Sequence, residues 1–212
     1  MTYLLHIDSS AVPHRSVSRD VAATFLAAWQ KENPELTVVH RDLTTDPLPH
    51  LTPDAVTGRV TAPEERTEAQ AAAIALQDTL IEEFHGAGAY LFTVPMYNNS
   101  VPSAFKAWVD QVFVVGRVIF GNPDQVPTRG RRAVVVASRG GGYGPGTPRE
   151  GMDHVTPFLQ TILGSSLGLD LDVITPELTM APNNPAMAAL RPLAEASLAK
   201  AHAEAEEYAR QF

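Results

Sequence analysis

The sequence contains no cysteine, and this absence excludes both disulfide bridges and thiolate metal sites. A reducing cytosol is therefore the natural compartment for the chain. Long apolar runs are absent too, since no stretch approaches the roughly 18 residues needed to cross a bilayer. The N-terminal segment lacks the basic flank and cleavage signature of a secretory signal, because the short run that begins at Leu4 stops at Asp8. We expect a cytoplasmic protein that does not enter a membrane.

Positive charge is scarce: 16 lysines and arginines stand against 24 aspartates and glutamates, which gives a formal net charge of −8. A nucleic-acid-binding surface needs basic residues to neutralise phosphates, so this balance argues against nucleic acid as the main partner. The 212 residues suit one large domain, and no internal repeat, low-complexity tract or linker divides them. We expect a single domain over residues 1–212.

The connection between the first predicted strand and helix lacks the glycine-rich fingerprints of dinucleotide-binding and P-loop proteins. It is instead rich in hydroxyls: Ser10 follows the strand at residues 3–7, and Ser16 and Ser18 precede a helical stripe of apolar residues. A helix N-terminus binds phosphate through its amides and dipole, and serine hydroxyls add donors without charge. The pattern indicates a phosphate site, with His14 as a further contact. The alternative is that Ser16 only caps the helix.

Residues 90–94 form a continuous apolar run, which is typical of a strand buried on both faces of a parallel sheet. Pro95 should end this strand, and Pro102 should open a helix that is capped by one of the two residues before it. The elbow between them consists of Met96, Tyr97, Asn98 and Asn99. Ligands of open α/β sheets bind where strands end, and this elbow offers amides, carboxamides, an aromatic face and a thioether. We interpret it as the floor of a flavin site; the alternative is an ordinary turn with Tyr97 in the core.

A glycine-rich loop follows the strand predicted at residues 133–137. Five of the nine residues from Ser138 to Gly146 are glycine. Glycine lets backbone amides approach a ligand edge closely and adopts positive φ without strain. We interpret the loop as a cradle for the same ligand, and a mobile surface loop is the alternative.

Two further stretches carry candidate substrate contacts. Residues 43–66 contain four prolines and no predicted element, which is typical of a functional flap or a subunit contact. Arg59 within this stretch is a candidate for the phosphate of a pyridine nucleotide, although a solvated arginine is the alternative. The apolar residues 113–120 predict a short hairpin or loop that covers the site or a partner subunit. Phe120 is a candidate contact for a bound ring, and simple core packing is its alternative.

The remaining elements complete an α/β pattern. Strands are predicted at residues 36–40 and 169–174, a helix with a capping box at Thr67 and Gln70 runs to about residue 85, and a last helix begins at Pro185. Five strands that alternate with helices predict a doubly wound parallel sheet with right-handed crossovers. In the order 2-1-3-4-5, the loops after strands one, three and four meet at the switch point.

The chain resembles the FMN-dependent NADH-azoreductases, a branch of the flavodoxin-like NAD(P)H:quinone reductases, over nearly its whole length. The matching stretches are residues 8–10, 16–18, 89–98, 138–141 and 155–159. Pro-Met-Tyr-Asn at residues 95–98 and Ser-Arg-Gly-Gly at residues 138–141, about forty residues apart, form a specific pair.

The resemblance implies a flavodoxin-like fold and non-covalent FMN, with hydride passing from NADH or NADPH through flavin N5 to a quinone or azo compound in a ping-pong cycle. The implied cofactor-binding residues are Ser10, Ser16, Val17, Ser18, Pro95, Met96, Tyr97, Asn98, Asn99, Ser138, Arg139, Gly140, Gly141 and Tyr143. It also implies a homodimer whose two sites lie at the subunit interface. The chain departs from the family pattern at Val17, Asn99, Tyr143 and residues 165–166, which affects specificity more than cofactor binding. We assign no catalytic side chain and no metal, because the histidines lack metal-ligand spacing.

Two other functions share parts of this pattern. A flavodoxin-like electron carrier would have the same fold but would stabilise the semiquinone and turn over nicotinamide poorly. A binding or signalling domain without flavin would leave the serine and glycine loops without a role. The length of the chain beyond a minimal five-stranded domain favours the enzyme.

Overall fold

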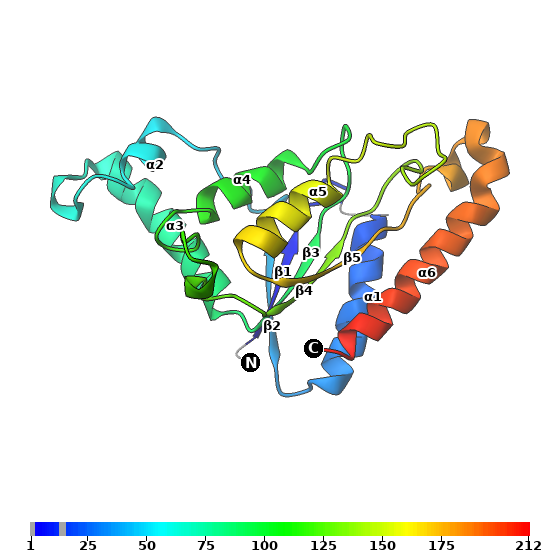
Figure 1. The fold of residues 1–212 in the computed structure, drawn as a ribbon, viewed down its shortest axis with the longest axis horizontal. Coiled ribbons are helices and arrows are strands. Elements are labelled where there is room, and N and C mark those ends of the chain that lie inside the picture. Colours follow the sequence, from blue (N-terminus) through cyan, green and yellow to red (C-terminus); the bar gives the residue numbers. More distant parts are fainter. Residues whose placement is uncertain (1–2, 13–15) are drawn as a thin grey trace.

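A parallel sheet of five strands lies at the centre of the computed structural model, which describes residues 3–12 and 16–212 (Figure 1). The strands are β1 (Tyr3–Asp8), β2 (Thr37–Asp42), β3 (Ala89–Thr93), β4 (Arg132–Val136) and β5 (Asp170–Ile174). Their order across the sheet is β2-β1-β3-β4-β5, and each neighbouring pair is parallel. The predicted α/β fold and the order 2-1-3-4-5 are confirmed.

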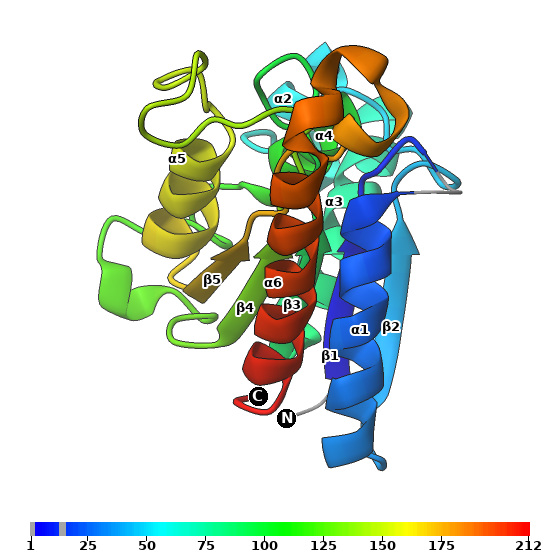
Figure 2. The same cartoon turned by 90° about the vertical axis from the view of Figure 1, so that its right-hand side faces the viewer.

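Helices cover both faces of the sheet (Figures 1 and 2). On one face, α1 (Val17–Glu32) and α6 (Arg191–Ala209) lie side by side. On the other face lie α3 (Glu68–Gly86), α4 (Ser103–Val112) and α5 (Thr156–Leu159), the last continued by a π-helical segment (Gln160–Ser166). Side chains of a strand alternate between faces, so Leu5 packs with α3 and α4 whereas Leu4 packs with α1 and α6.

The helix caps agree with the sequence patterns at two of three sites. Ser16 caps α1, and Thr67 and Gln70 form the predicted capping box of α3. The prediction for α4 was wrong by one position: Pro102 itself is the N-cap residue, with φ −57° and ψ 144°. Ser100 cannot serve as the cap because its backbone N–H and carbonyl both bond to Tyr97 in the preceding turn.

Two stretches contain structure that the sequence patterns missed. Residues 43–66 include a short helix, α2 (Pro53–Thr57), which Thr52 caps, and a 3₁₀ turn (Pro63–Glu65). The last helix does not begin at Pro185 as predicted; a 3₁₀ segment (Pro185–Leu190) precedes α6, and Leu190 is exposed rather than turned inward. The buried positions of α6 are all alanine, so its backbone packs closely against α1. Other 3₁₀ turns are Pro123–Gln125 and Ala181–Asn183.

The two edge strands carry charged residues. Arg132 on β4 reaches across to Asp170 at 2.8 Å and Asp172 at 3.0 Å on the edge strand β5. On the opposite edge, Arg41 of β2 pairs with Glu83 of α3 at 2.7 Å. Among the helices of the described residues, none combines the length and the apolar character that a membrane span requires.

Candidate active site

Loops from three strands meet beyond the carboxyl ends of the sheet. The backbone N–H of Met96, after β3, donates to the carbonyl of Ser138, after β4, at 2.8 Å. The hydroxyl of Tyr97 accepts from the backbone N–H of Ala11, after β1, at 3.0 Å. The Met96–Tyr97 elbow therefore joins all three loops, as the strand order predicted.

The serines at the start of α1 form a hydrogen-bonded cluster. Ser16 Oγ donates to Ser10 Oγ at 2.8 Å and lies 3.1 Å from Ser18 Oγ, and all three residues are buried. Tyr97 joins the cluster, because its hydroxyl lies 3.4 Å from Ser10 Oγ. Ser16 also caps α1, so the capping alternative holds without excluding a ligand. Rotatable hydroxyls at a helix N-terminus form a donor set that fits a phosphate; His14 lies outside the described residues.

The elbow after β3 is a tight turn with unusual backbone angles. Asn98 and Asn99 have φ values of 51° and 65°, and Tyr97 and Ser100 exchange backbone hydrogen bonds of 2.9 and 3.0 Å. Positive φ at both central positions is the pattern of a type I′ turn, in which asparagine is among the few residues tolerated. The two asparagines thus have a backbone role in addition to their carboxamides.

A cleft of about 440 Å³ opens beside this turn. Five residues that the sequence predicted as cofactor contacts line it, namely Met96, Asn98, Asn99, Gly140 and Tyr143. Tyr143 donates its hydroxyl hydrogen to Asn99 Oδ1 at 3.3 Å, which ties the glycine-rich loop to the turn. A Cβ at position 140 would lie 2.7 Å from Met180 Sδ, so a larger residue there would require the exposed side chain of Met180 to shift.

Three residues of the cleft wall were not predicted: Arg149, Met152 and Met180. They come from the segments that follow β4 and β5, which have no regular periodicity. Arg149 Nη1 donates to the hydroxyl of Tyr143 at 3.0 Å, and its guanidinium carbon lies 5.6 Å from the centre of that ring. No signal in the sequence marks these residues as neighbours.

The remaining predicted contacts lie around the site in different ways. The side chain of Arg139 is buried and pairs with Asp153 at 2.9 Å and Glu177 at 3.5 Å. Its backbone N–H donates to the carbonyl of Pro176 and its carbonyl accepts from Thr179, so Arg139 braces the loop. Burial tends to raise the pKa of Asp153, but hydrogen bonds from Thr156 and Val155, with the charge of Arg139, outweigh it and hold the pKa below its usual value. Pro95, Val17 and Gly141 flank the elbow, the start of α1 and the glycine-rich loop respectively.

The two predicted substrate contacts, Arg59 and Phe120, do not line this cleft. Arg59 donates to Gln77 Oε1 at 3.0 Å and to the carbonyl of Asp110 at 2.7 Å. It lines a second cleft, of about 350 Å³, beside α3. Phe120 is half-buried in the loop after α4 and lines neither cleft. Arg59 and Phe120 thus do not line the cleft beside the Asn98–Asn99 turn, and their assignment as substrate contacts stays a prediction.

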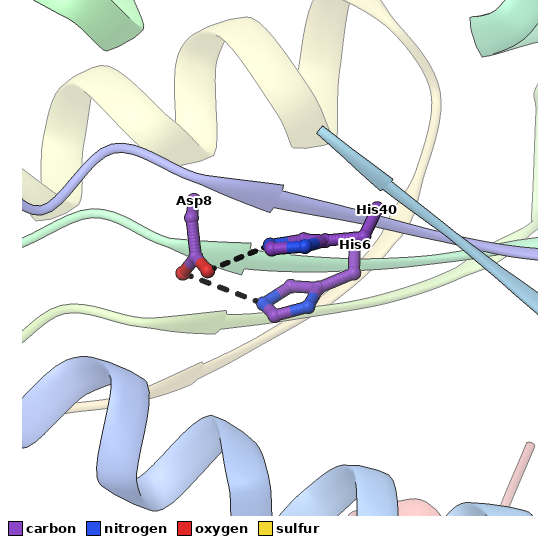
Figure 3. A group of neighbouring side chains, drawn as sticks. All are labelled: His6, Asp8 and His40. Atoms are coloured by element: carbon purple, nitrogen blue, oxygen red, sulfur yellow. Dashed lines mark hydrogen bonds and ion pairs between the residues drawn. The ribbon is translucent and has the colours of Figure 1, made fainter. Parts of the chain in front are cut away.

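A buried carboxylate, that of Asp8, lies at the carboxyl end of β1, close to His6 and His40 (Figure 3). Asp8 accepts hydrogen bonds from His40 Nε2 at 2.9 Å, Arg19 Nη1 at 3.0 Å and the hydroxyl of Thr93, and His6 Nε2 lies 3.5 Å away. Burial alone would raise the pKa of Asp8, but these partners outweigh it and hold the pKa well below its usual value. The same contact raises the pKa of His40.

Arg19 connects this network to the serine cluster. Its Nη2 donates to the carbonyl of Ser10 at 3.1 Å, and both terminal nitrogens bond to Asp42, at 2.7 and 3.0 Å. Burial tends to raise the pKa of Asp42, yet Arg19 and Thr44 lower it to about 2. The arginine therefore ties β1, β2 and the Ser10 loop together.

His6, Asp8 and His40 offer ligand atoms within 4.8 Å of one another, a grouping that spacing along the sequence did not reveal. His40 faces His6 because β1 and β2 pair in that register, and their rings stack at 4.7 Å. The guanidinium of Arg19 lies 3.0 Å from the same carboxylate and opposes a second cation there. The cluster is thus better suited to hold Arg19 than to hold a metal ion.

Comparisons with known proteins agree with this geometry. The family model of the flavodoxin-like fold matches residues 2–207. A curated FMN-dependent NADH:quinone oxidoreductase of Streptomyces avermitilis is 49% identical over 213 residues, which cover 100% of this chain and 97% of the relative. Its namesake from Streptomyces coelicolor is 50% identical over 97% of this chain and 92% of its own.

Solved structures show the same fold. An azoreductase of Bacillus anthracis superposes with a TM-score of 0.85 at 23% identity, over 100% of both chains. An FMN-dependent NADH-azoreductase of the same species, solved in complex with FMN, gives 0.83 at 19% identity, over 100% of this chain and 99% of its own. The chain therefore belongs to the flavodoxin-like family that includes the FMN-dependent NADH:quinone oxidoreductases.

Proposed function

We propose that this chain is an FMN-dependent NADH:quinone oxidoreductase that also reduces aromatic azo compounds. The observation that carries the proposal is the convergence at Tyr97, whose hydroxyl contacts the buried serine cluster while its neighbours Met96 and Asn98 line the cleft. Phosphate-binding hydroxyls next to a ring-sized cleft with amide edges are what FMN requires. The names of the Streptomyces relatives support the same activity and favour NADH over NADPH as donor.

The chain's own groups supply binding and orientation. Ser10, Ser16 and Ser18 would hold the phosphate, with the backbone N–H of Val17 at the first turn of α1. Carboxamides of the Asn98–Asn99 turn and amides of the glycine-rich loop would meet the polar edges of the ring. FMN, when bound, supplies the two-electron hydride chemistry, so no protein side chain needs to act as nucleophile.

The cleft also supports an ordered exchange of substrates. Its volume of about 440 Å³ is small for a ring cofactor, a nicotinamide and an acceptor together. Donor and acceptor would therefore occupy the space in turn, which is a ping-pong cycle. The residues of the rim, including Arg149 and Met180, would shield the ring from water.

We also propose that residues 1–212 act as one FMN-binding domain and that two copies form a homodimer. Exposed valines rim the second cleft: the relative accessible surface is 88% for Val60, 80% for Val115 and 49% for Val56. A partner that covers this apolar patch would remove it from water. Arg59 in that cleft and Phe120 nearby would then serve the interface. A cytoplasmic location, where NADH is available, completes the proposal.

An anaerobic visible spectrum tests the function. The protein is loaded with FMN, one equivalent of NADH is added, and benzoquinone follows. We expect rapid bleaching and full recovery without a radical band. Failure to bind FMN would overturn the site, and a long-lived radical with slow NADH oxidation would identify an electron carrier instead.

A further inference from the structure

We infer that the cleft is extended by an acceptor subsite for planar aromatic compounds that carry a carboxylate or sulfonate, with Arg149 binding the acid group. The inference rests on the proposed function, and it names the acceptor class. Three observations lead to it: a third cleft that adjoins the cleft beside the Asn98–Asn99 turn, an unusual gathering of methionines, and an arginine without a carboxylate partner.

The third cleft shares a wall with the cleft beside the Asn98–Asn99 turn. It encloses about 270 Å³, and Gly140, Arg149 and Met180 line both spaces. Leu178 and Pro148 also line it. A ligand stacked against the elbow at Met96 can therefore extend past Arg149 without leaving the protein surface.

Methionine is concentrated here. The sequence has five methionines, and the four within the described residues, Met96, Met152, Met180 and Met187, all line one or both clefts. Met152 and Met180 are also exposed, at 43% and 56% relative accessible surface. Flexible, polarizable thioethers contact aromatic rings favourably and adapt to different shapes, which is why such surfaces accept varied ligands. The walls thus fit flat aromatic molecules of varied outline.

Arg149 provides a positive charge at the junction of the two clefts. The nearby carboxylates of Asp153 and Glu177 are paired with Arg139. Among the ion pairs of the described residues, none includes Arg149; its partners are the ring and hydroxyl of Tyr143. An arginine held on an aromatic ring keeps free donors for a planar acid group, which it can bind in bidentate geometry.

Matched dyes test the inference. Methyl red carries a carboxylate, and its methyl ester has the same rings without the charge. Each dye is dialysed to equilibrium against the oxidised, FMN-loaded protein without NADH, so that binding is measured without turnover. We expect Arg149→Gln to weaken methyl red binding about tenfold and to change binding of the ester less than about twofold, because only the charged hydrogen bonds are lost. Arg149→Lys should restore part of the affinity.

Arg210→Gln is the matched control, because it removes an exposed arginine at the end of α6, where its partner is Glu206. It should leave the binding of both dyes unchanged. The comparison separates the effect of the contact with Arg149 from the effect of removing one positive charge. The inference would be overturned if Arg149→Gln weakened the binding of both dyes equally, or if it weakened the binding of neither dye. A raised KM for NADH with unchanged dye binding would also overturn it, by assigning Arg149 to the donor's diphosphate. FMN loading and NADH bleaching of the wild-type protein test the proposed function separately, because they do not depend on which dye binds.

Discussion

Asn98 shows how one side chain can serve the backbone and the ligand at once. Its φ of 51° places it in the left-handed region, where alanine is strained and glycine is not. Its side chain also lines the cleft in which we place the flavin ring. A simple alanine substitution would therefore mix two effects, whereas a pair of substitutions separates them.

We expect Asn98→Ala to lower the free energy of unfolding by about 1 kcal/mol, because of the strained turn, and Asn98→Gly to leave it nearly unchanged. Both should weaken FMN binding by about 1–3 kcal/mol, because both remove the carboxamide. Chemical denaturation and FMN fluorescence titration measure the two quantities. If Asn98→Gly binds FMN with wild-type affinity, the carboxamide of Asn98 does not contact FMN.

Arg19 offers a second test at the level of a single residue. It holds the carbonyl of Ser10 and pairs with Asp8 and Asp42, so Arg19→Gln should loosen the Ser10 loop and leave Asp42 without a cationic partner, while Asp8 keeps His40. We expect a loss of about 3 kcal/mol in stability. FMN affinity should fall about tenfold or more, while affinity for riboflavin, which has no phosphate, stays constant.

Arg132→Gln is a suitable control for this substitution. Arg132 also bridges two aspartates, Asp170 and Asp172, but at the other edge of the sheet. Its loss should leave FMN affinity unchanged. If Arg19→Gln weakens FMN and riboflavin equally, the arginine acts on the fold and not on the Ser10 loop.

At the scale of elements, β1, β2 and α1 are joined by side chains whose pKa values are shifted in opposite directions. Asp8 and Asp42 have lowered pKa values, so their contribution to stability is present above the unfolded pKa near 3.8 and is lost as pH falls below it. His40 has a raised pKa, so its contribution is present below its unfolded pKa of about 6.5 and is lost as pH rises through the folded pKa. The network is therefore most stabilising between these limits.

We expect the unfolding temperature to decrease below about pH 4 and to decrease again as pH rises above about 6.5. The upper decrease should disappear in His40→Gln, and the lower one should remain. Calorimetric scans at constant ionic strength from pH 3 to 9 would check both limbs. If the unfolding temperature of His40→Gln still decreases above about pH 6.5, a group other than His40 causes that decrease.

The order of elements was predictable because the strands are short runs rich in apolar and β-branched residues, and because α1, α3 and α4 have an apolar stripe or a capping pattern. The missed elements have other causes. α2 is too short for periodicity, and the segment before α6 is apolar without a helical face. Within the site, residues on one elbow or one loop were predictable, whereas the juxtaposition of Arg149 with Met180, or of His6 with His40, depends on tertiary packing and strand register.

At the scale of the whole molecule, the apolar patch around Val60 and Val115 lies beside α3, whereas α6 covers the opposite face of the sheet (Figure 1). The double substitution of Val60 and Val115 by aspartate should turn the proposed homodimer into a monomer, because two charges would be buried at the interface. Analytical ultracentrifugation measures the mass. Leu193→Asp, at an exposed apolar position of α6, is the control and should remain dimeric. A monomeric wild type would refute the proposed assembly.

The charged edges of the sheet have a consequence for how copies of this chain can meet. An unprotected edge strand is a template for adding further strands, which leads to open-ended aggregation. Here β5 presents Asp170 and Asp172 and β2 presents His40 and Arg41, so pairing of two β5 edges, or of two β2 edges, would place like charges opposite each other. Charge on the edge strands therefore disfavours contacts in which two copies join through the same edge of the sheet.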